Sequence, residues 1–436
     1  MALGGGTFTT QNKVLPGTYI NFISKATSSG GLSTRGVVAM GLELNWGADS
    51  GIITITSEDL IKNSLKVLGY SYSDDSLKGI RDVFAHATKL YVYKLTNGGV
   101  KASNTYATAK YCGTRGNDLK VVVAVNADDE EKFDVSLYLG ITLIDLQTVS
   151  SSADLVDNDF VDWKKDSTLE ATAGISLTGG TNGTVTGTNH QDFLDLIESY
   201  PDVNAIGYVG TDSTTKALYK AFAERMRNEV GVKLQVVLYN FSGDSEAVVN
   251  VKNTVSDESA GTGDLVYWAT GVIAGTAVNE SATNIVYDGE FTPVVDYTQT
   301  QLANAIESGE WTLHRVGDEI HVLEDINSLT TFTEQKGDVF KDNQTIRVID
   351  QIATDTASIF NTKYLGKVPN DADGRLSLWN DVKKVHTQLQ DMRAIENFSD
   401  EDITVEQGSG KKSIVISDSI EVINTMTKLY MTVVVG

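Results

Sequence analysis

The sequence predicts a multidomain protein of mixed α/β and α+β class: an α/β sheet domain with a β-rich insertion, then a C-terminal α+β assembly domain, with extended terminal arms. Three observations support this prediction. Strand and helix patterns alternate in two separate stretches, the segment between them shows only strands and turns, and two long amphipathic helices precede β-prone residues at the C terminus. The 436 residues also exceed one ordinary hydrophobic core.

The domain boundaries follow from these changes in pattern. We expect a β arm at 1–23, the first part of the α/β domain at 24–96, the β-rich insertion domain at 97–180, the second part of the α/β domain at 181–330, and the C-terminal assembly domain at 331–436, whose residues 425–436 form a second arm.

The N-terminal residues have the pattern of extended structure. Thr7 to Val14 is polar and β-prone, Pro16-Gly17 suits the centre of a type II turn, and Tyr19 to Ile23 has strand character. Few nearby segments could pair with such a strand, so we expect it to pair with a distant segment or with another chain.

The first α/β stretch and the insertion differ in periodicity. Helices are predicted at 57–68, where Glu58 and Asp59 suit the first turn, and at 75–87, with a strand at 90–95. In the insertion, strands are predicted at 119–125 and 133–144, and no convincing amphipathic helix appears.

The second α/β stretch predicts a mostly parallel sheet with right-handed crossovers, because its strands are separated by helices. The expected elements are a helix capped by Asn189 that ends at Pro201, a strand at 204–209, a helix at 212–229, a strand at 232–239 and a short strand at 264–268.

The remaining elements lead into the assembly domain. Thr298 to Gln301 is a capping-box pattern, and residues 311–326 predict a hairpin that turns near Gly317. Two long helices follow, with apolar stripes running from Ile346 to Phe360 and from Leu378 to Met392. Strands are expected at 413–416 and 429–435.

The last predicted strand is apolar and lacks proline, so an exposed edge there would aggregate without a constant partner. Both ends of the chain are therefore candidate arms for strand addition between subunits. The alternative is that both strands fold back into their own domain. The arm residues that we expect to make these contacts are Thr18, Tyr19, Ile20, Phe22, Leu429, Tyr430, Met431, Thr432, Val433, Val434 and Val435.

The charge balance restricts the possible partners. The chain has 35 basic and 58 acidic residues, a formal net charge of −23, which repels nucleic acid and anionic lipid. We therefore expect no nucleic-acid and no membrane partner. Like-charged subunits would also repel one another, so a polymer needs clustered Lys and Arg or an interface made of backbone hydrogen bonds.

The sequence also points to a protein made and kept in a cytoplasm. Cys112 is the single cysteine, which excludes an internal disulfide and a multi-thiolate metal site. The first residues lack the basic and apolar segments of a secretion signal, and apolar runs are too short to span a bilayer.

Motifs for catalysis, cofactors and metals are weak, so we expect no catalytic residue, no cofactor and no metal. The chain lacks a phosphate-binding G-x-x-x-x-G-K-[ST] loop and a G-x-S-x-G motif. His314 and His321 on the predicted hairpin favour a structural pair, and Asp371 to Gly374 favours a turn over a calcium loop. The acids from Asp154 to Asp162 favour solvated loop charge, with weak cation binding as the alternative.

Five segments together resemble one known family. They are Leu15 to Phe22, Tyr111 to Asn117 (Tyr-Cys-Gly-Thr-Arg-Gly-Asn), Trp268 to Gly275 followed by Ser281, Tyr364 to Lys367, and Ser419 to Tyr430. Each alone is common, but their order and spacing over nearly the whole chain resemble the contractile tail sheath proteins of myophages and R-type tailocins. The similarity is to the compact sheath proteins of Gram-positive phages.

The resemblance implies a structural subunit that polymerises around an inner tail tube protein and contracts to drive this tube through a cell envelope. In such sheaths the terminal arms of neighbours add strands to a third subunit's C-terminal domain. It also implies baseplate and tail-terminator partners, a peripheral insertion, and tube contacts for which Lys383, Lys384 and Arg393 are candidates. Assembly would take place in the bacterial host cytoplasm, before the sheath serves in a virion tail or a released tailocin.

Two alternatives belong to other classes. The first is an α/β enzyme with a β insertion, whose ligand would sit at the carboxyl ends of the strands among converging polar residues. The second is the larger sheath component of a type VI secretion system, which would assemble as a hetero-oligomer.

Overall fold

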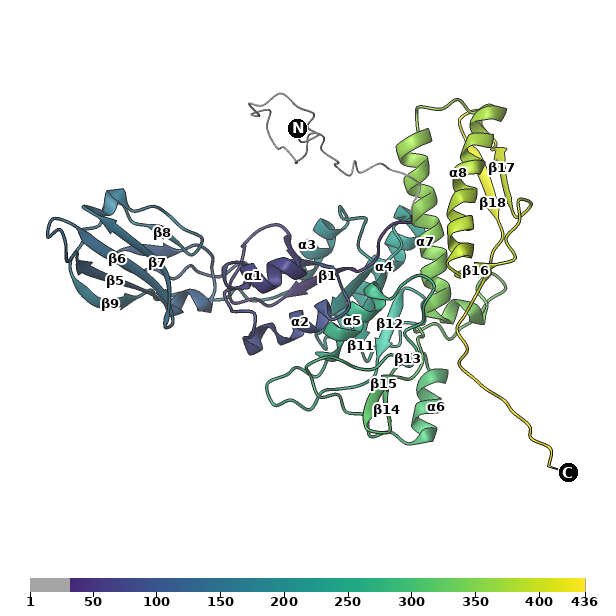
Figure 1. Ribbon diagram of the computed structural model, residues 1–436, viewed down its shortest axis with the longest axis horizontal. Helices are drawn as coiled ribbons and strands as arrows, with labels where there is room; N and C mark the ends of the chain where they lie inside the picture. The colour runs from purple at the N-terminus through teal and green to yellow at the C-terminus, as the bar shows by residue number, and fades with distance from the viewer. Residues whose placement is uncertain (1–31, 436) are drawn as a thin grey trace, which may run out of the picture.

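The computed structural model describes residues 32–435, and the main parts of the molecule follow one another along its long axis (Figure 1). The insertion lies at one end, the central sheet in the middle and the C-terminal helices at the other end. The mixed α/β multidomain class is therefore confirmed. Thr18, Tyr19, Ile20 and Phe22 of the predicted N-terminal arm lie outside the described residues.

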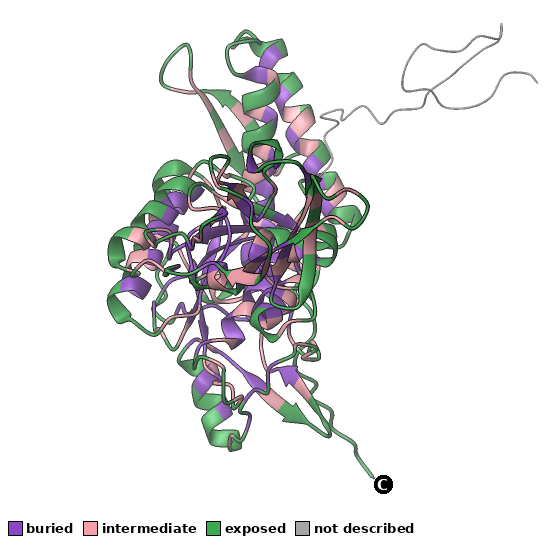
Figure 2. Ribbon diagram, turned by 90° about the vertical axis from the view of Figure 1, so that its left-hand side faces the viewer, coloured by how far each residue is buried: buried purple, intermediate pink, exposed green. Residues whose placement is uncertain are grey.

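The central domain is built on a seven-stranded sheet in the order β13-β12-β11-β10-β1-β3-β2, parallel except for β2, which pairs antiparallel with β3. Strands β1 and β10 to β12 are buried along almost their whole length, as expected for parallel strands covered on both faces (Figure 2). The strands are β1 (Val37–Leu42), β2 (Ile53–Thr56), β3 (Lys89–Lys94), β10 (Ala205–Tyr208), β11 (Gln235–Tyr239), β12 (Val248–Val251) and β13 (Glu310–Trp311).

Helices cover both faces of this sheet. One face carries α1 (Ser57–Leu68), α2 (Lys78–Phe84) and α5 (Leu265–Gly275), and the other carries α3 (Gly187–Ile197) and α4 (Ser213–Arg225). Alternate side chains of each strand point to opposite faces, so Val38 and Met40 join the first core while Val37 and Ala39 join the second.

The predicted strand at 264–268 was wrong, because these residues begin helix α5. All residues from Leu265 to Ala274 except Tyr267 are buried, and periodicity cannot distinguish such a helix from a buried strand. The helix lies very close to α2: a Cβ at Gly271 would lie 2.4 Å from the Val83 carbonyl oxygen.

Of the two helix starts predicted from capping patterns, one is confirmed and one was wrong. The predicted capping box at Thr298 and Gln301 is present and opens α6 (Gln299–Glu307). The predicted N-cap Asn189 was wrong, because Thr186 is the N-cap of α3. The Asn189 side chain accepts a hydrogen bond from the backbone N–H of Thr186 at 2.9 Å. The hairpin predicted at Gly317 is formed by β14 (Leu313–Val316) and β15 (Glu319–Val322).

The insertion contains an antiparallel four-stranded sheet in the order β7-β6-β5-β9 and a two-stranded sheet of β4 and β8. Its strands are β4 (Ala107–Ala109), β5 (Leu119–Val125), β6 (Phe133–Leu139), β7 (Thr142–Val149), β8 (Val161–Trp163) and β9 (Thr172–Ser176). The single strand predicted at 133–144 is two strands, because Gly140 adopts a φ of 60° in a tight turn.

The segment 111–117 joins the insertion to the central domain. Lys94, at the end of β3, is buried and donates to the Cys112 carbonyl oxygen (2.6 Å) and to the Asp49 carboxylate (2.9 Å). Gly113 has a φ of 129°, and a Cβ there would lie 2.0 Å from the Asn45 carbonyl oxygen. The two connecting chains lie side by side, since Gly183 N–H donates to Thr96 C=O at 2.9 Å.

The C-terminal domain packs two long helices against two small sheets. Strands β17 and β18 form an antiparallel hairpin, and β16 pairs with β19. The elements are α7 (Asn343–Ile359), α8 (Ala372–Asp391), β16 (Ile395–Glu396), β17 (Ile403–Gln407), β18 (Ile414–Asp418) and β19 (Glu421–Val422). Within the described residues no helix is both long and apolar enough to cross a bilayer.

Replacing Gly113 by Ala should destabilise the protein by at least about 2 kcal/mol, because the new Cβ meets a backbone carbonyl at a left-handed φ. Thermal or urea unfolding measures the loss. Gly98→Ala is the control, since a Cβ at Gly98 meets no atom within 4 Å. Equal stability of the two variants would show that the joint at 111–117 is not tightly packed.

Candidate assembly interface

Helix α7 lies buried between the central domain and the C-terminal layer. Eleven of its residues are buried, including Asn343, Arg347 and Asp350, and the polar ones are held by hydrogen bonds or ion pairs. Arg227 of the central domain forms a bidentate salt bridge with Asp350, and both N···O distances are 2.7 Å. Arg347 pairs with the fully buried Asp325 at 2.5 Å.

Burial shifts the pKa of several groups around α7. Burial, followed by the positive charge of Arg347, lowers the pKa of Arg35 to about 10. Burial raises the pKa of Asp342, the N-cap of α7, to about 6. For Arg227 burial acts downward, but the Asp350 carboxylate outweighs it and raises the pKa. The interface between the two domains therefore contains two desolvated ion pairs, Arg227–Asp350 and Arg347–Asp325. Arg35 and Asp342 are held there by backbone groups instead.

The β17–β18 hairpin has one apolar face and two open edges. Ile403, Val405 and Ile416 face the helices, and Trp379 of α8 donates its indole N–H to the Ile403 carbonyl oxygen at 2.8 Å. Thr404 and Val415 face outward and are exposed. Within the described residues neither outer edge has a strand partner, so both edges present free backbone N–H and C=O groups.

His386 fastens the hairpin to α8. Its Nδ1 lies 3.1 Å from the Val382 carbonyl oxygen and its Nε2 lies 2.8 Å from the Asp418 carboxylate. Both neighbours only accept hydrogen bonds, so a proton on each nitrogen satisfies the site. Burial alone would lower the pKa of His386, but the hydrogen bonds to Asp418 and Val382 outweigh it and raise the pKa.

The C-terminal segment runs away from the body of the molecule (Figure 1). The residues from which it starts, Ile423 to Thr425, are its root. The root is anchored, since Ile423 N–H donates to the Ala394 carbonyl oxygen at 3.0 Å. Beyond Thr425 the side chains are exposed, and Leu429, Tyr430 and Val434 are each 88% exposed. The strand predicted at 429–435 has no pairing partner among the described residues, and it does not fold back into its own domain.

In an extended conformation this segment is amphipathic. Alternate side chains of a strand point to opposite faces. One face would carry only apolar side chains from Leu429 onward, whereas the other would mix Lys428, Tyr430 and Thr432 with Val434. The apolar face consists of Leu429, Met431, Val433 and Val435.

The three basic residues proposed from sequence do not form one patch. Lys383 pairs with Asp400 and lies over the Trp379 ring, and Lys384 pairs with Asp381 at 2.9 Å. Arg393 is exposed just after α8 and has a φ of 62°. Two of the three charges are thus already paired within the subunit.

The weak chemical motifs have structural roles. His314 and His321 face each other across the β14–β15 hairpin, and Asp371 caps α8 through the Gly374 N–H at 2.8 Å. In the acidic stretch, Asp159 pairs with Lys66 and Asp162 with Lys110. No group of three or more His, Cys, Asp or Glu side chains that could hold a metal occurs within residues 32–435.

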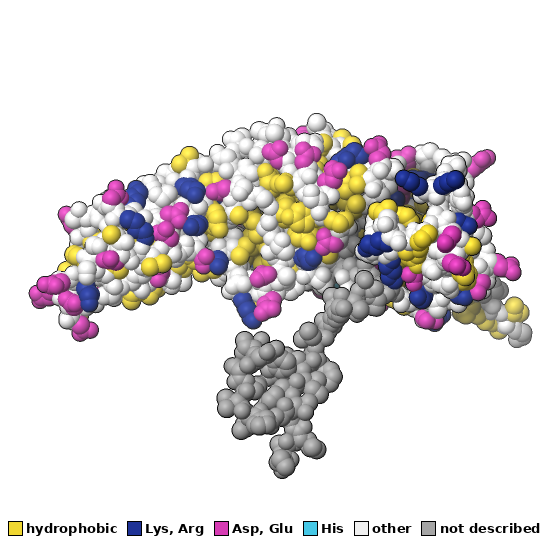
Figure 3. Space-filling model, turned by 90° about the horizontal axis from the view of Figure 1, so that it is seen from above, with side chains coloured by type: hydrophobic (Ala, Val, Ile, Leu, Met, Phe, Trp, Pro, Cys, Tyr) yellow, Lys and Arg dark blue, Asp and Glu magenta, His cyan; other side chains and the backbone are white. Residues whose placement is uncertain are grey.

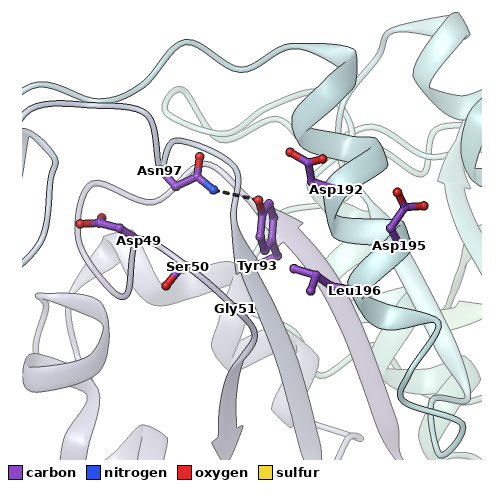
Figure 4. Close-up of a pocket in the computed structure, with 8 residues that line it drawn as sticks. All are labelled: Asp49, Ser50, Gly51, Tyr93, Asn97, Asp192, Asp195 and Leu196. Carbon is purple, nitrogen blue, oxygen red and sulfur yellow. Dashed lines mark hydrogen bonds between the residues drawn. The ribbon is translucent and has the colours of Figure 1, made fainter.

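Two hollows of the central domain bear on the alternative that the protein is an enzyme. The first, of about 450 Å³, lies between the end of β3 and α3, where Asp192, Asp195 and Tyr93 face it (Figure 4). Asp49 lines it too, but its carboxylate is bound by Lys94 and by Cys112. No Lys, Arg or His side chain lines this hollow, so Asp192 and Asp195 have no cationic or imidazole partner among its lining residues.

The second hollow, of about 220 Å³, lies where the strand order changes direction between β1 and β10. His190 and Tyr208 line it, and burial lowers the pKa of the first and raises that of the second. Asp212 caps α4 at this edge and accepts from Thr215 N–H at 2.7 Å, so a carboxylate already occupies the helix end that would bind a phosphate.

Sequence reasoning missed one strand of the interface, β17. The signal was the alternation of Ile403 and Val405 ahead of the turn residues Gly408 to Gly410. The pairing of His386 with Asp418, 32 positions apart, left no signal in the sequence.

Comparison with known families gives one result for the whole described chain. Four family models match in order: the tail sheath protein Gp18 domain III N-terminal region (35–95), the phage tail sheath protein beta-sandwich domain (97–182), the phage tail sheath protein central domain (183–328) and the phage tail sheath C-terminal domain (335–436).

Individual relatives agree with this result. The phage-like element PBSX protein XkdK of Bacillus subtilis is 32% identical over 100% of both chains, and the tail sheath protein of Clostridium phage phiCD119 is 28% identical over 48% of this chain and 59% of its own. The crystal structure of the sheath tail protein from Desulfitobacterium hafniense has a TM-score of 0.83 at 37% identity, covering 95% of this chain and 99% of its own. The contracted helical sheath of the anti-feeding prophage shares the fold, with a TM-score of 0.57 at 11% identity over 97% and 99% of the two chains.

The His386 site predicts a pH dependence of stability. Since the folded pKa is raised, the Asp418 pair stabilises the fold fully below the unfolded pKa of about 6.5, and this contribution is lost as the pH rises through the folded pKa. The gap in melting temperature between the wild type and His386→Gln should therefore narrow from about pH 6 to about pH 9. A gap that widens over this range would contradict a protonated His386.

Proposed function

Because this chain belongs to the contractile phage tail sheath family, we propose that it polymerises by strand exchange and that the resulting sheath contracts around an inner tube. The C-terminal arm of one subunit adds a strand to an open edge of a neighbour's β17–β18 hairpin, and the N-terminal arm of another neighbour occupies the opposite edge. The domain boundaries expected from sequence, including the insertion at 97–180 and the arms at 1–23 and 425–436, are part of this proposal.

One observation carries the proposal: an unpaired, strand-prone C-terminal segment occurs in the same subunit as a two-stranded sheet with open edges. Each feature alone would favour aggregation. If the segment pairs with the hairpin of another copy, the free backbone groups of the segment and of the sheet edge form hydrogen bonds with each other. The Ile403 side of the hairpin is covered by helices, so the apolar face of an added strand would continue that inner face.

The charge distribution suits this mode of association. Residues 331–436 contain 12 basic and 16 acidic residues, so they contribute only −4 of the net charge of −23. Acidic side chains gather at the far end of the insertion, where residues 128–131 are all Asp or Glu (Figure 3). The repulsion between subunits is therefore weakest in the domain that exchanges strands, and backbone pairing does not depend on side-chain charge.

The remaining roles follow the family. The insertion faces outward, and the C-terminal domain faces the tube, with Lys383, Lys384 and Arg393 as tube contacts. The partners are further copies of the chain, an inner tail tube protein, and baseplate and tail-terminator proteins, met first in the bacterial host cytoplasm. Contraction is a rigid-body rearrangement of subunits, and it uses no nucleotide and no catalytic residue.

Negative-stain electron microscopy of the purified full-length chain tests the proposal. We expect hollow, helically striated tubes at high concentration in moderate salt, or after addition of the tube protein as a template. A chain that remains monomeric under both conditions overturns self-assembly, and a chain that assembles only with a second, smaller sheath protein favours the type VI alternative.

Deleting residues 427–436 should leave a folded subunit that does not form tubes, because residues 427–435 are exposed and pair with no strand in the described part of the chain. Circular dichroism and thermal unfolding check the fold, and electron microscopy checks assembly. Normal tubes from the truncated chain would exclude strand addition by the C-terminal arm.

The alternation of the arm predicts which side chains matter. Val433 lies on the apolar face and Val434 on the opposite face of an extended arm, so the same substitution can be placed on both. Val433→Thr should raise the critical concentration for assembly roughly tenfold, the effect of burying one unpaired hydroxyl. Val434→Thr is the matched control, and sedimentation of tubes over a concentration series measures both. Equal effects would show that the arm does not bind as a strand with one buried face.

A further inference from the structure

Two glutamines of helix α7 hold the chain segments from which the two arms start. Gln344 and Gln351 are almost fully buried, at 1% and 4% exposure, and lie seven residues apart. Residues at this spacing share one face of a helix, two turns apart, which is about 10.5 Å along the axis.

Gln344 binds the root of the C-terminal arm as a neighbouring strand would. Its side-chain amide donates to the Ile423 carbonyl oxygen at 3.0 Å and accepts from the Thr425 N–H at 3.1 Å. The C=O of one residue and the N–H of the residue two further on are the pair that a β partner engages. The first residue beyond this bond, Met426, is fully exposed.

Gln351 holds the segment that follows the N-terminal arm. Its amide donates to the Ser33 hydroxyl at 2.8 Å and to the Ser33 carbonyl oxygen at 3.2 Å. Asp355, one turn further along α7, accepts from the Ser33 N–H at 3.0 Å and from the Gln351 amide at 2.7 Å. Both backbone polar groups of Ser33 are thus bound by side chains of α7.

We infer that Gln344 and Gln351 are positioning residues that fix the starting points of both arms on one rigid helix, and so set the free length of each arm. This inference rests on the proposed function, since only an arm that pairs with another subunit transmits a pull. A pull on either arm then reaches α7, which the Arg227–Asp350 and Arg347–Asp325 pairs hold against the central domain.

The free length of the C-terminal arm depends on the Gln344 bond. With Thr425 held, an arm of the residues after it reaches a fixed distance, at about 3.3 Å for each extended residue. If the bond were lost, Ile423 to Thr425 could leave the surface of α7, and each residue released would lengthen the tether between subunits. Gln344 therefore controls the spacing of neighbours, although it does not contact them.

The test uses Gln→Met substitutions, which keep the side-chain volume and remove the amide. Gln344→Met and Gln351→Met are compared with Gln390→Met, because Gln390 also accepts from a backbone N–H in the same domain (Phe398, 2.8 Å) but touches neither arm. The first readout is hydrogen exchange in the unassembled full-length chain. We expect about tenfold faster exchange at Thr425 in Gln344→Met, because the Gln344 carbonyl oxygen accepts that N–H. The increase at Ser33 in Gln351→Met should be smaller, because Asp355 still accepts the Ser33 N–H. Neither amide should change in Gln390→Met.

The second readout is the helical rise and order of assembled tubes, measured by cryo-electron microscopy. Gln344→Met should give tubes with a larger or irregular subunit spacing, and Gln390→Met should give wild-type tubes. Unchanged exchange, or wild-type tubes despite faster exchange, overturns the inference while leaving strand exchange intact. If instead the wild type and the chain lacking residues 427–436 assemble alike, the proposed function fails, and the exchange measurement still decides whether the two glutamines hold the roots.

Discussion

The burial of a polar helix between two domains is the constraint on which the rest of this structure depends. Helix α7 carries Asn343, Arg347, Asp350 and Asp355 in buried positions, where a polar group without a partner costs free energy. The partners come from both sides, including Arg227 and Asp325 of the central domain. Paired, desolvated charges are strongly directional and tolerate little sliding, so the two domains are fixed in one relative orientation. Such a subunit moves relative to its neighbours as a rigid body more readily than its two domains move relative to each other.

The proposed strand exchange is compatible with the strongly acidic composition of the chain. Most of the net negative charge lies before residue 331, whereas the last residues, from Met426 onward, contain Lys428 as their only charged side chain. An interface made of main-chain hydrogen bonds leaves the surface charge free to keep unassembled subunits soluble and apart. Association and solubility thus rest on different parts of the molecule.

Elements set by local chemistry could be predicted from the sequence, and elements set by distant contacts could not. Helix α1, strand β5 and the capping box of α6 agree with prediction because their signals lie within a few residues. Helix α5 was mistaken for a strand since burial on all sides removed its periodicity. In the candidate site, the apolar C-terminal segment was recognisable from composition, while the anchors at its root, Gln344 and Ala394, are about 80 and 30 residues away and carry no local pattern.

The insertion enters and leaves the central domain through two chain segments that are hydrogen-bonded to each other at Thr96 and Gly183. Its core is a cluster of its own that also takes in Trp46 of the central domain. A module attached in this way can be exchanged for another of similar end-to-end spacing without disturbing the sheet that carries it. The joint is therefore a grafting point. In the proposed sheath, where the insertion faces outward, a foreign domain attached there would be displayed in many regularly spaced copies.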